Sequence, residues 1–200
     1  LASEHYSMAA RSFLDELYSP RDYAQRDTQF ARIAGTLQTV FPRQVVHTAV
    51  ALAQLHVDTE TLDHQMAQAW LGQDGAADPG DDASRYLQAW RSTGQRHARD
   101  AQLQGVLFIG RELERLTRLP GLRLMLKMMR RPAQAAGLEA LQQFLEAGFD
   151  TFAELSRHPQ GVAQFLGCIE TREAALMRDW FDAPVVTCET QLRQLLGQAR

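Results

Sequence analysis

The chain has 200 residues and a formal net charge of −3 at pH 7. A chain of this length can bury a sizeable core as a single domain, and its net negative charge argues against a general nucleic-acid-binding protein, which needs a concentrated positive face. No run approaches the roughly 18 apolar residues of a membrane-spanning helix. We therefore predict one domain over residues 1–200, with no nucleic acid partner and no transmembrane segment.

The apolar residues recur every three or four positions, and strand-like alternation is nowhere sustained, which predicts an all-α fold. A first helix is expected over residues 4–18. Ser19 is a suitable N-cap and Pro20 a suitable first residue for the next helix, because proline needs no hydrogen-bond acceptor there. A further segment is expected to begin at Asp27 or Thr28 and to end near residue 41.

Pro42 is expected to open an apolar helix, and Asp58 or Thr59 to cap the start of another helix that ends at Leu71. Residues 72–82 are rich in glycine and aspartate and contain Pro79, so they predict a loop and the best candidate for a hinge. The predicted domain thus has an N-terminal helical cluster over residues 1–71, the loop over 72–82 and a helical bundle over 83–200.

The rest of the chain predicts one long helix over residues 83–118 and four shorter ones. These are expected over residues 120–130, 132–157 with a break at Gly137, 159–181 and 184–198. The second and third of them carry aromatic-rich stripes at helical spacing, which would pack on the long helix as the core of a multi-helix bundle. Gly105 and Gly110 have phosphate-loop spacing but no preceding strand, and we interpret them as close helix–helix contacts.

Residues 12–16 read Ser-Phe-Leu-Asp-Glu and run into Leu-Tyr-Ser-Pro-Arg-Asp-Tyr. This stretch resembles the start of the bacterial FFLEE-motif family, in which a Phe-Phe-Leu-Glu-Glu helix is followed by a Tyr-Gly-Pro-Arg-Asp-like turn. Ser12 and Asp15 stand where the motif has phenylalanine and glutamate. The resemblance continues through Ile33 and includes residues 144–150. It implies an uncharacterised bacterial protein and assigns no catalytic residue.

The turn after this helix contains a first candidate site, formed by Arg21, Asp22 and Arg26. Arginine side chains near a helix start can bind a carboxylate or a phosphate. Asp22 also lies four residues before Arg26, the spacing of an ordinary ion pair within a helix. The sequence leaves both interpretations open, a binding site and an intramolecular latch.

The basic segment over residues 118–131 contains the second candidate site, with Arg123, Met125, Lys127 and Met128 as binding residues. Methionines suit adaptable contact surfaces, and a basic apolar helix can bind a partner helix or lie on an anionic membrane surface. The segment could equally be a core helix whose arginines reach the solvent. We expect a homodimer or a partner protein at this segment.

Other chemistries have weaker signals. His56, Glu60 and His64 are four residues apart, but the cap expected at residues 58–59 would break their alignment, so we predict no metal site. Residues 55–57, Leu-His-Val, are the best place for haem or another flat apolar ligand. No nucleophile motif is present, and Cys168 has neither a helix N-terminal position nor a histidine nearby in sequence that would activate its thiol.

The sequence therefore predicts a bacterial protein with no catalytic activity and no cofactor, a binding or regulatory module that acts through helix–helix contacts. The alternative is a carrier or sensor of haem or a lipid-like ligand in the bundle interior. Residues 1–6 have neither a basic start nor an apolar signal region, and the cysteines, Cys168 and Cys188, lie in predicted helices rather than in a disulfide framework. We therefore expect reduced thiols and a cytoplasmic location.

Overall fold

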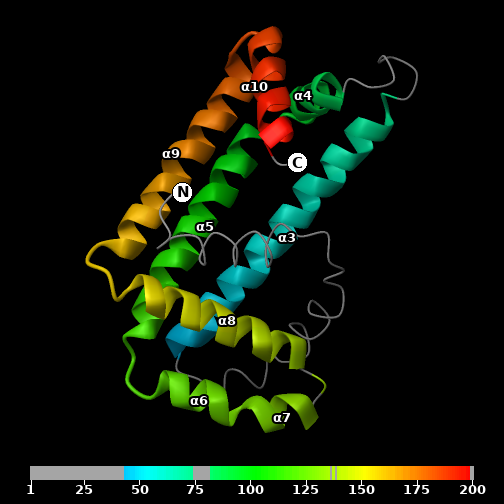
Figure 1. The fold of residues 1–200 in the computed structure, drawn as a ribbon. Helices are drawn as coiled ribbons and strands as arrows, with labels where there is room; N and C mark the ends of the chain where they lie inside the picture. The colour runs from blue at the N-terminus through cyan, green and yellow to red at the C-terminus, as the bar shows by residue number, and fades with distance from the viewer. Residues whose placement is uncertain (1–42, 74–81, 136, 138, 199–200) are drawn as a thin grey trace. The chain divides into compact units, whose positions relative to one another are not determined.

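The computed structural model describes residues 43–73, 82–135, 137 and 139–198, and all their regular structure is α-helical, as the sequence predicts (Figure 1). No helix among these residues is long and apolar enough to cross a membrane. The described helices, in chain order, are α3 (Arg43–Leu71), α4 (Asp82–Thr93), α5 (Arg96–Thr117), α6 (Leu122–Met128), α7 (Arg130–Ala135), α8 (Glu139–Leu155), α9 (Gly161–Asp182) and α10 (Val185–Gln198).

Helix α3 is continuous for 29 residues, so the predicted cap at Asp58 or Thr59 is wrong. The polar side chains bond within the helix instead of ending it. The Thr59 hydroxyl donates to the carbonyl of Leu55 at 2.8 Å, and the Gln54 amide donates to Asp58 Oδ1 at 2.9 Å. Because a threonine hydroxyl can bond to the carbonyl four residues earlier, a cap residue type in mid-helix need not begin a new helix.

The predicted long helix over residues 83–118 is also wrong, because it is divided into α4 and α5. Gly94 and Gln95 both have left-handed backbone conformations, with φ of 66° and 61°. The Gly94 N–H still donates to the carbonyl of Trp90 at 3.1 Å, which is typical of a glycine that ends a helix. Two successive left-handed residues then redirect the chain before α5 begins.

The other predicted boundaries agree well with the structure. Helix α3 ends at Leu71 and α4 begins at Asp82, the two sides of the predicted loop. Gly137 has φ of 70° and separates α7 from α8, so the predicted break is confirmed. The predicted helices before residue 42 lie outside the described residues. The chain divides into two compact units, and the single-domain organisation stays a prediction.

The described part of the first unit comprises residues 43–53 and 107–167, apart from 136 and 138. Its described core lies where α6 and the end of α5 pack on α8, and α6 and α7 both contact α8 (Figure 1). The aromatic stripe predicted for α8 is part of this core, since Phe149 is 6% exposed. The buried members of the cluster are Leu116, Leu122, Leu126 and Phe149.

The described part of the second unit comprises residues 54–73, 82–106 and 168–198. Helix α4 packs against α10 and contributes Leu87 to a core that contains the fully buried Cys188. Arg91 on α4 caps the end of α9, because its guanidinium donates to the carbonyl of Trp180 at 2.7 Å and of Ala183 at 2.5 Å. Cys168 and Cys188 are not joined to each other by a disulfide, and their reduced state stays a prediction.

The two glycines of α5 lie at close helix contacts, as predicted. A Cβ atom at Gly105 would be 3.1 Å from Leu55 Cδ1 of α3, within the second unit. A Cβ atom at Gly110 would be only 2.5 Å from Leu166 Cδ2 of α9, within the first unit. Leu166 is 4% exposed, so it has little room to move away.

We expect Gly110→Ala to lower the free energy of unfolding by about 1–3 kcal/mol, because the added methyl group overlaps Leu166 in a packed core. Gly148→Ala in α8 is the matched control, since that glycine is also inside a helix but has no atom within 4 Å of the added Cβ. Replacing it should raise stability by about 0.4–1 kcal/mol. Urea denaturation of both variants measures the difference, and equal effects at both sites would contradict the close contact.

Candidate functional site

Helix α6 presents one buried side and one exposed side. Leu122 and Leu126 are 4% and 6% exposed and pack into the core, and Met125 packs against them from a half-buried position. Leu124 and Met128 are 63% and 68% exposed. Since residues four apart share a helix face, Leu124 and Met128 form an outer apolar pair on α6.

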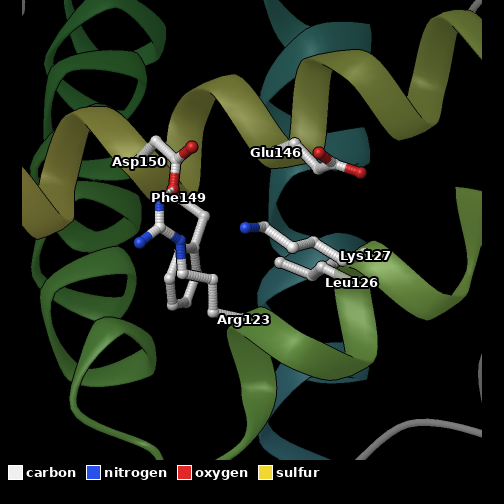
Figure 2. A pocket seen from close by; sticks show the side chains of 6 residues that line it. All are labelled: Arg123, Leu126, Lys127, Glu146, Phe149 and Asp150. Carbon is white, nitrogen blue, oxygen red and sulfur yellow. Dashed lines mark ion pairs between the residues drawn. The ribbon is translucent and has the colours of Figure 1, made fainter.

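Basic side chains beside this pair meet acidic side chains of α8. Arg123 forms an ion pair with Asp150, with Nη2 2.9 Å from Oδ1, and Arg130 forms a bidentate pair with Glu146, with its Nε 2.8 Å from Oε1. Figure 2 shows Arg123 of α6 reaching toward Asp150 of α8. The two pairs run in opposite chain directions, as expected of antiparallel helices. Each pair links α8 to the α6–α7 segment, and solvent screening keeps the contribution of such exposed pairs to stability modest.

The buried side chain of Gln142 supports the pairing of α8 with α6 through two hydrogen bonds. Gln142 is 8% exposed, and its amide donates to the carbonyl of Leu126 at 2.6 Å and to Glu146 Oε1 at 2.9 Å. The pKa of Glu146 is lowered, chiefly by the hydrogen bond from Arg130 and further by Gln142. Glu146 is therefore an anion at neutral pH and is poorly suited to act as a general acid.

The remaining cation of α6 is Lys127. Among the described residues it forms no hydrogen bond or ion pair, although it lies close enough to Glu146 to lower the pKa of that carboxylate. Figure 2 shows its ammonium group between α6 and α8, beside a pocket of about 10 Å³ that is lined by Leu126 and Phe149. Such a volume holds roughly one water molecule. A space of this size is too small to enclose a substrate.

A family model described as a domain of unknown function, DUF8198, matches residues 1–184. The chain belongs to this family. No curated protein and no solved structure is significantly similar to it. Membership in DUF8198 is consistent with an uncharacterised class of protein and assigns no activity to helix α6 or its neighbours.

The predicted site residues fall into two groups. Arg123, Met125, Lys127 and Met128 lie together on α6, whereas Arg21, Asp22 and Arg26 lie outside the described residues. The binding roles of both groups stay predictions.

The continuous helix α3 places His56, Glu60 and His64 at regular spacing, but the described residues contain no group of three His, Cys, Asp or Glu side chains placed to hold a metal ion. His64 bonds to Gln68 within the helix at 2.9 Å. Leu55, beside His56, packs over Gly105. A haem or lipid-like ligand at residues 55–57 therefore stays a prediction without a specific observation in its favour.

Sequence reasoning missed the acidic partners of the basic segment. Glu146 and Asp150 are four residues apart, as are Arg123 and Lys127, and this matched spacing of opposite charges was the available signal for two facing helices. Arg118 of the segment is paired as well, with Glu114, and Arg115, which precedes the segment, is paired with Glu112. The basic segment is thus largely neutralised by its own surroundings, which weakens the case for an anionic membrane surface.

We expect Glu146→Gln to reduce the pH dependence of stability in acid. A carboxylate whose pKa is lowered in the folded state stabilises the fold above its unfolded pKa of about 4.3, and this contribution is lost as the pH falls through the folded pKa. The variant should be less stable than the wild type at pH 7, and the two should converge near pH 3. Urea denaturation at several pH values measures this.

Glu154→Gln serves as the control. Glu154 forms an ion pair with Arg157 on the surface, but among the described residues it accepts no hydrogen bond from a buried glutamine. A similar loss of acid dependence in both variants would contradict the special role of Glu146.

Proposed function

We propose that this chain is a non-catalytic binding module that acts through helix–helix contacts of the α6 surface, with a second copy of the chain as its partner. The α6 surface consists of the outer apolar pair and the charged side chains beside it: Arg123, Leu124, Lys127, Met128, Glu146 and Asp150. The observation that carries the proposal is the exposure of Leu124 and Met128, at 63% and 68%. Burial in a helix–helix contact would gain about 1.5–3 kcal/mol for each side chain.

Charge supports a second copy as the partner. A two-fold contact places the same patch of each subunit against the other, so the patch must complement itself. Arg123 and Lys127 of α6 lie next to Glu146 and Asp150 of α8, which gives the surface both signs of charge. The ammonium of Lys127 could bind a carboxylate of the second subunit, and an exclusively basic surface would not offer this match.

We further propose a cytoplasmic location, which the free thiols Cys168 and Cys188 support, since thiols persist in reducing compartments. The sequence of residues 12–16 supports the proposal that this family and the bacterial FFLEE-motif family are the same. A regulatory role would follow if the contact controls the availability of α6 to other proteins.

We expect the wild type to show a concentration-dependent dimer in sedimentation velocity, and the double variant Leu124→Glu, Met128→Glu to remain monomeric, because four like charges would face one another across the contact. Val186→Glu is the matched control, since Val186 on α10 is a 73% exposed apolar residue outside the α6 surface. It should dimerise as the wild type does.

Circular dichroism of all variants checks that they retain their helical content. A wild type that is monomeric at every concentration would contradict the second copy as the partner. A dimer that persists in the double variant would place the contact elsewhere and would equally contradict the proposal.

A further inference from the structure

Arg99 of α5 is buried with part of its guanidinium unmatched. It is 6% exposed, and its Nε and Nη2 atoms form no hydrogen bond within the described part of the chain. Burial lowers its pKa, which is the expected response of a cation that loses its water. Other buried polar side chains of the described residues do form hydrogen bonds, among them Thr48, Glu112 and Gln142. A buried guanidinium with unmatched N–H groups therefore calls for an explanation.

Trp90 accounts for only part of the environment of Arg99. The guanidinium carbon lies 3.6 Å from the centre of the Trp90 ring, so the cation stacks on the indole face. This contact attracts the charge through the π electrons. It supplies no acceptor for the guanidinium Nε and Nη2 atoms, which have none among the described residues.

Two further donors in the same cluster are unmatched. Trp90 and Trp180 pack edge to face with their ring centres 5.0 Å apart, and the buried indole N–H of each has no hydrogen-bond partner among the described residues. Two more aromatic rings surround them. The ring centre of Tyr86 is 5.6 Å from that of Trp180, and the ring centre of Phe181 is 5.5 Å from that of Trp90. All of these residues belong to the second unit. The cluster thus concentrates hydrogen-bond donors that lack a matching acceptor in the described structure.

Neighbouring arginines of the same unit show how differently Arg99 is placed. Arg96, one turn earlier on α5, pairs with Asp182, and Arg91 donates to two carbonyl groups at the end of α9. Asp63 lies within electrostatic reach of Arg99 but, in the part of the chain that the structure describes, forms no ion pair with it within 4.0 Å. Arg99 therefore stacks on Trp90 while two of its guanidinium nitrogens have no hydrogen-bond acceptor within the described part of the chain.

We propose that Arg99, together with the indole N–H groups of Trp90 and Trp180, binds an oxyanion, a carboxylate or phosphate group of a small molecule. Two N–H groups of one guanidinium match two oxygens of such a group, and the binding is strongest away from water. The aromatic side chains around the donors favour an anion attached to an apolar body. This site is independent of the α6 surface and would give the module a ligand.

The test uses the full chain and three probes, sodium acetate, sodium benzoate and sodium phosphate, against sodium chloride of equal ionic strength. We expect a bound probe to raise the melting temperature with concentration and to change tryptophan fluorescence, because two of the three tryptophans lie in the cluster. Trp70→Phe as the background restricts the signal to Trp90 and Trp180. Response to acetate and benzoate would identify a carboxylate site, and response to phosphate alone a phosphate site.

Arg99→Met removes the guanidinium while keeping an apolar side chain of similar length. We expect it to weaken binding at least tenfold, the effect of losing about 1.4 kcal/mol or more of charge-assisted hydrogen bonding, and to leave the melting temperature of the free protein unchanged or higher. Arg96→Met is the matched control on the same helix and should bind as the wild type does. Asp63→Asn should bind more tightly, because a nearby negative charge is removed.

A purely structural role for Arg99 predicts different results. No probe would then affect the wild type, and Arg99→Met and Asp63→Asn would both lower the melting temperature, as expected if water links the two charges. That combination would overturn the proposal. Loss of probe binding in Arg96→Met to the same extent as in Arg99→Met would also overturn it, because the effect would then come from surface charge.

Discussion

The close approach of helices at the two glycines of α5 is the constraint on which the packing of both units depends. Gly105 admits Leu55 of α3 in one unit, and Gly110 admits Leu166 of α9 in the other. A side chain at either position would separate the helices, and the buried residues around them would lose contacts that packed cores cannot easily replace. Leu107, between the two glycines, is completely buried, which shows how little free space surrounds this part of α5.

Arginine side chains complete the packing where carbonyl groups and carboxylates lack partners. Arg91 satisfies the last carbonyls of α9, and Arg130 orients Glu146, which in turn accepts from the buried Gln142. Helix ends leave carbonyl groups without partners inside the helix, so a long cationic side chain from another element is an efficient cap. These matched arginines make the unmatched guanidinium of Arg99 stand out within the same fold.

Sequence periodicity was sufficient to predict the all-α class and most helix ends, because glycine, proline and apolar spacing act locally. It failed where one residue type has two roles. Thr59 has the chemistry of a cap yet bonds back within α3, and Gly94, which ends α4, is no different in sequence from the helical glycines of α5. The candidate site was only half predictable: the basic residues of α6 were found, but their acidic partners depend on tertiary packing.

Neither of the two features proposed to act in binding contributes much to the stability of the isolated chain. An exposed Leu124 and Met128 gain nothing from the core, and the buried Arg99 loses hydration at two nitrogens that have no acceptor among the described residues. Local rules of packing and hydrogen bonding are obeyed elsewhere in the same helices, for example by Leu126 on α6 and Leu103 on α5. Departures of this kind are expected at functional sites, because a partner or ligand supplies the missing contacts only on binding. The contrast within each helix is therefore a stronger argument for function than either feature alone.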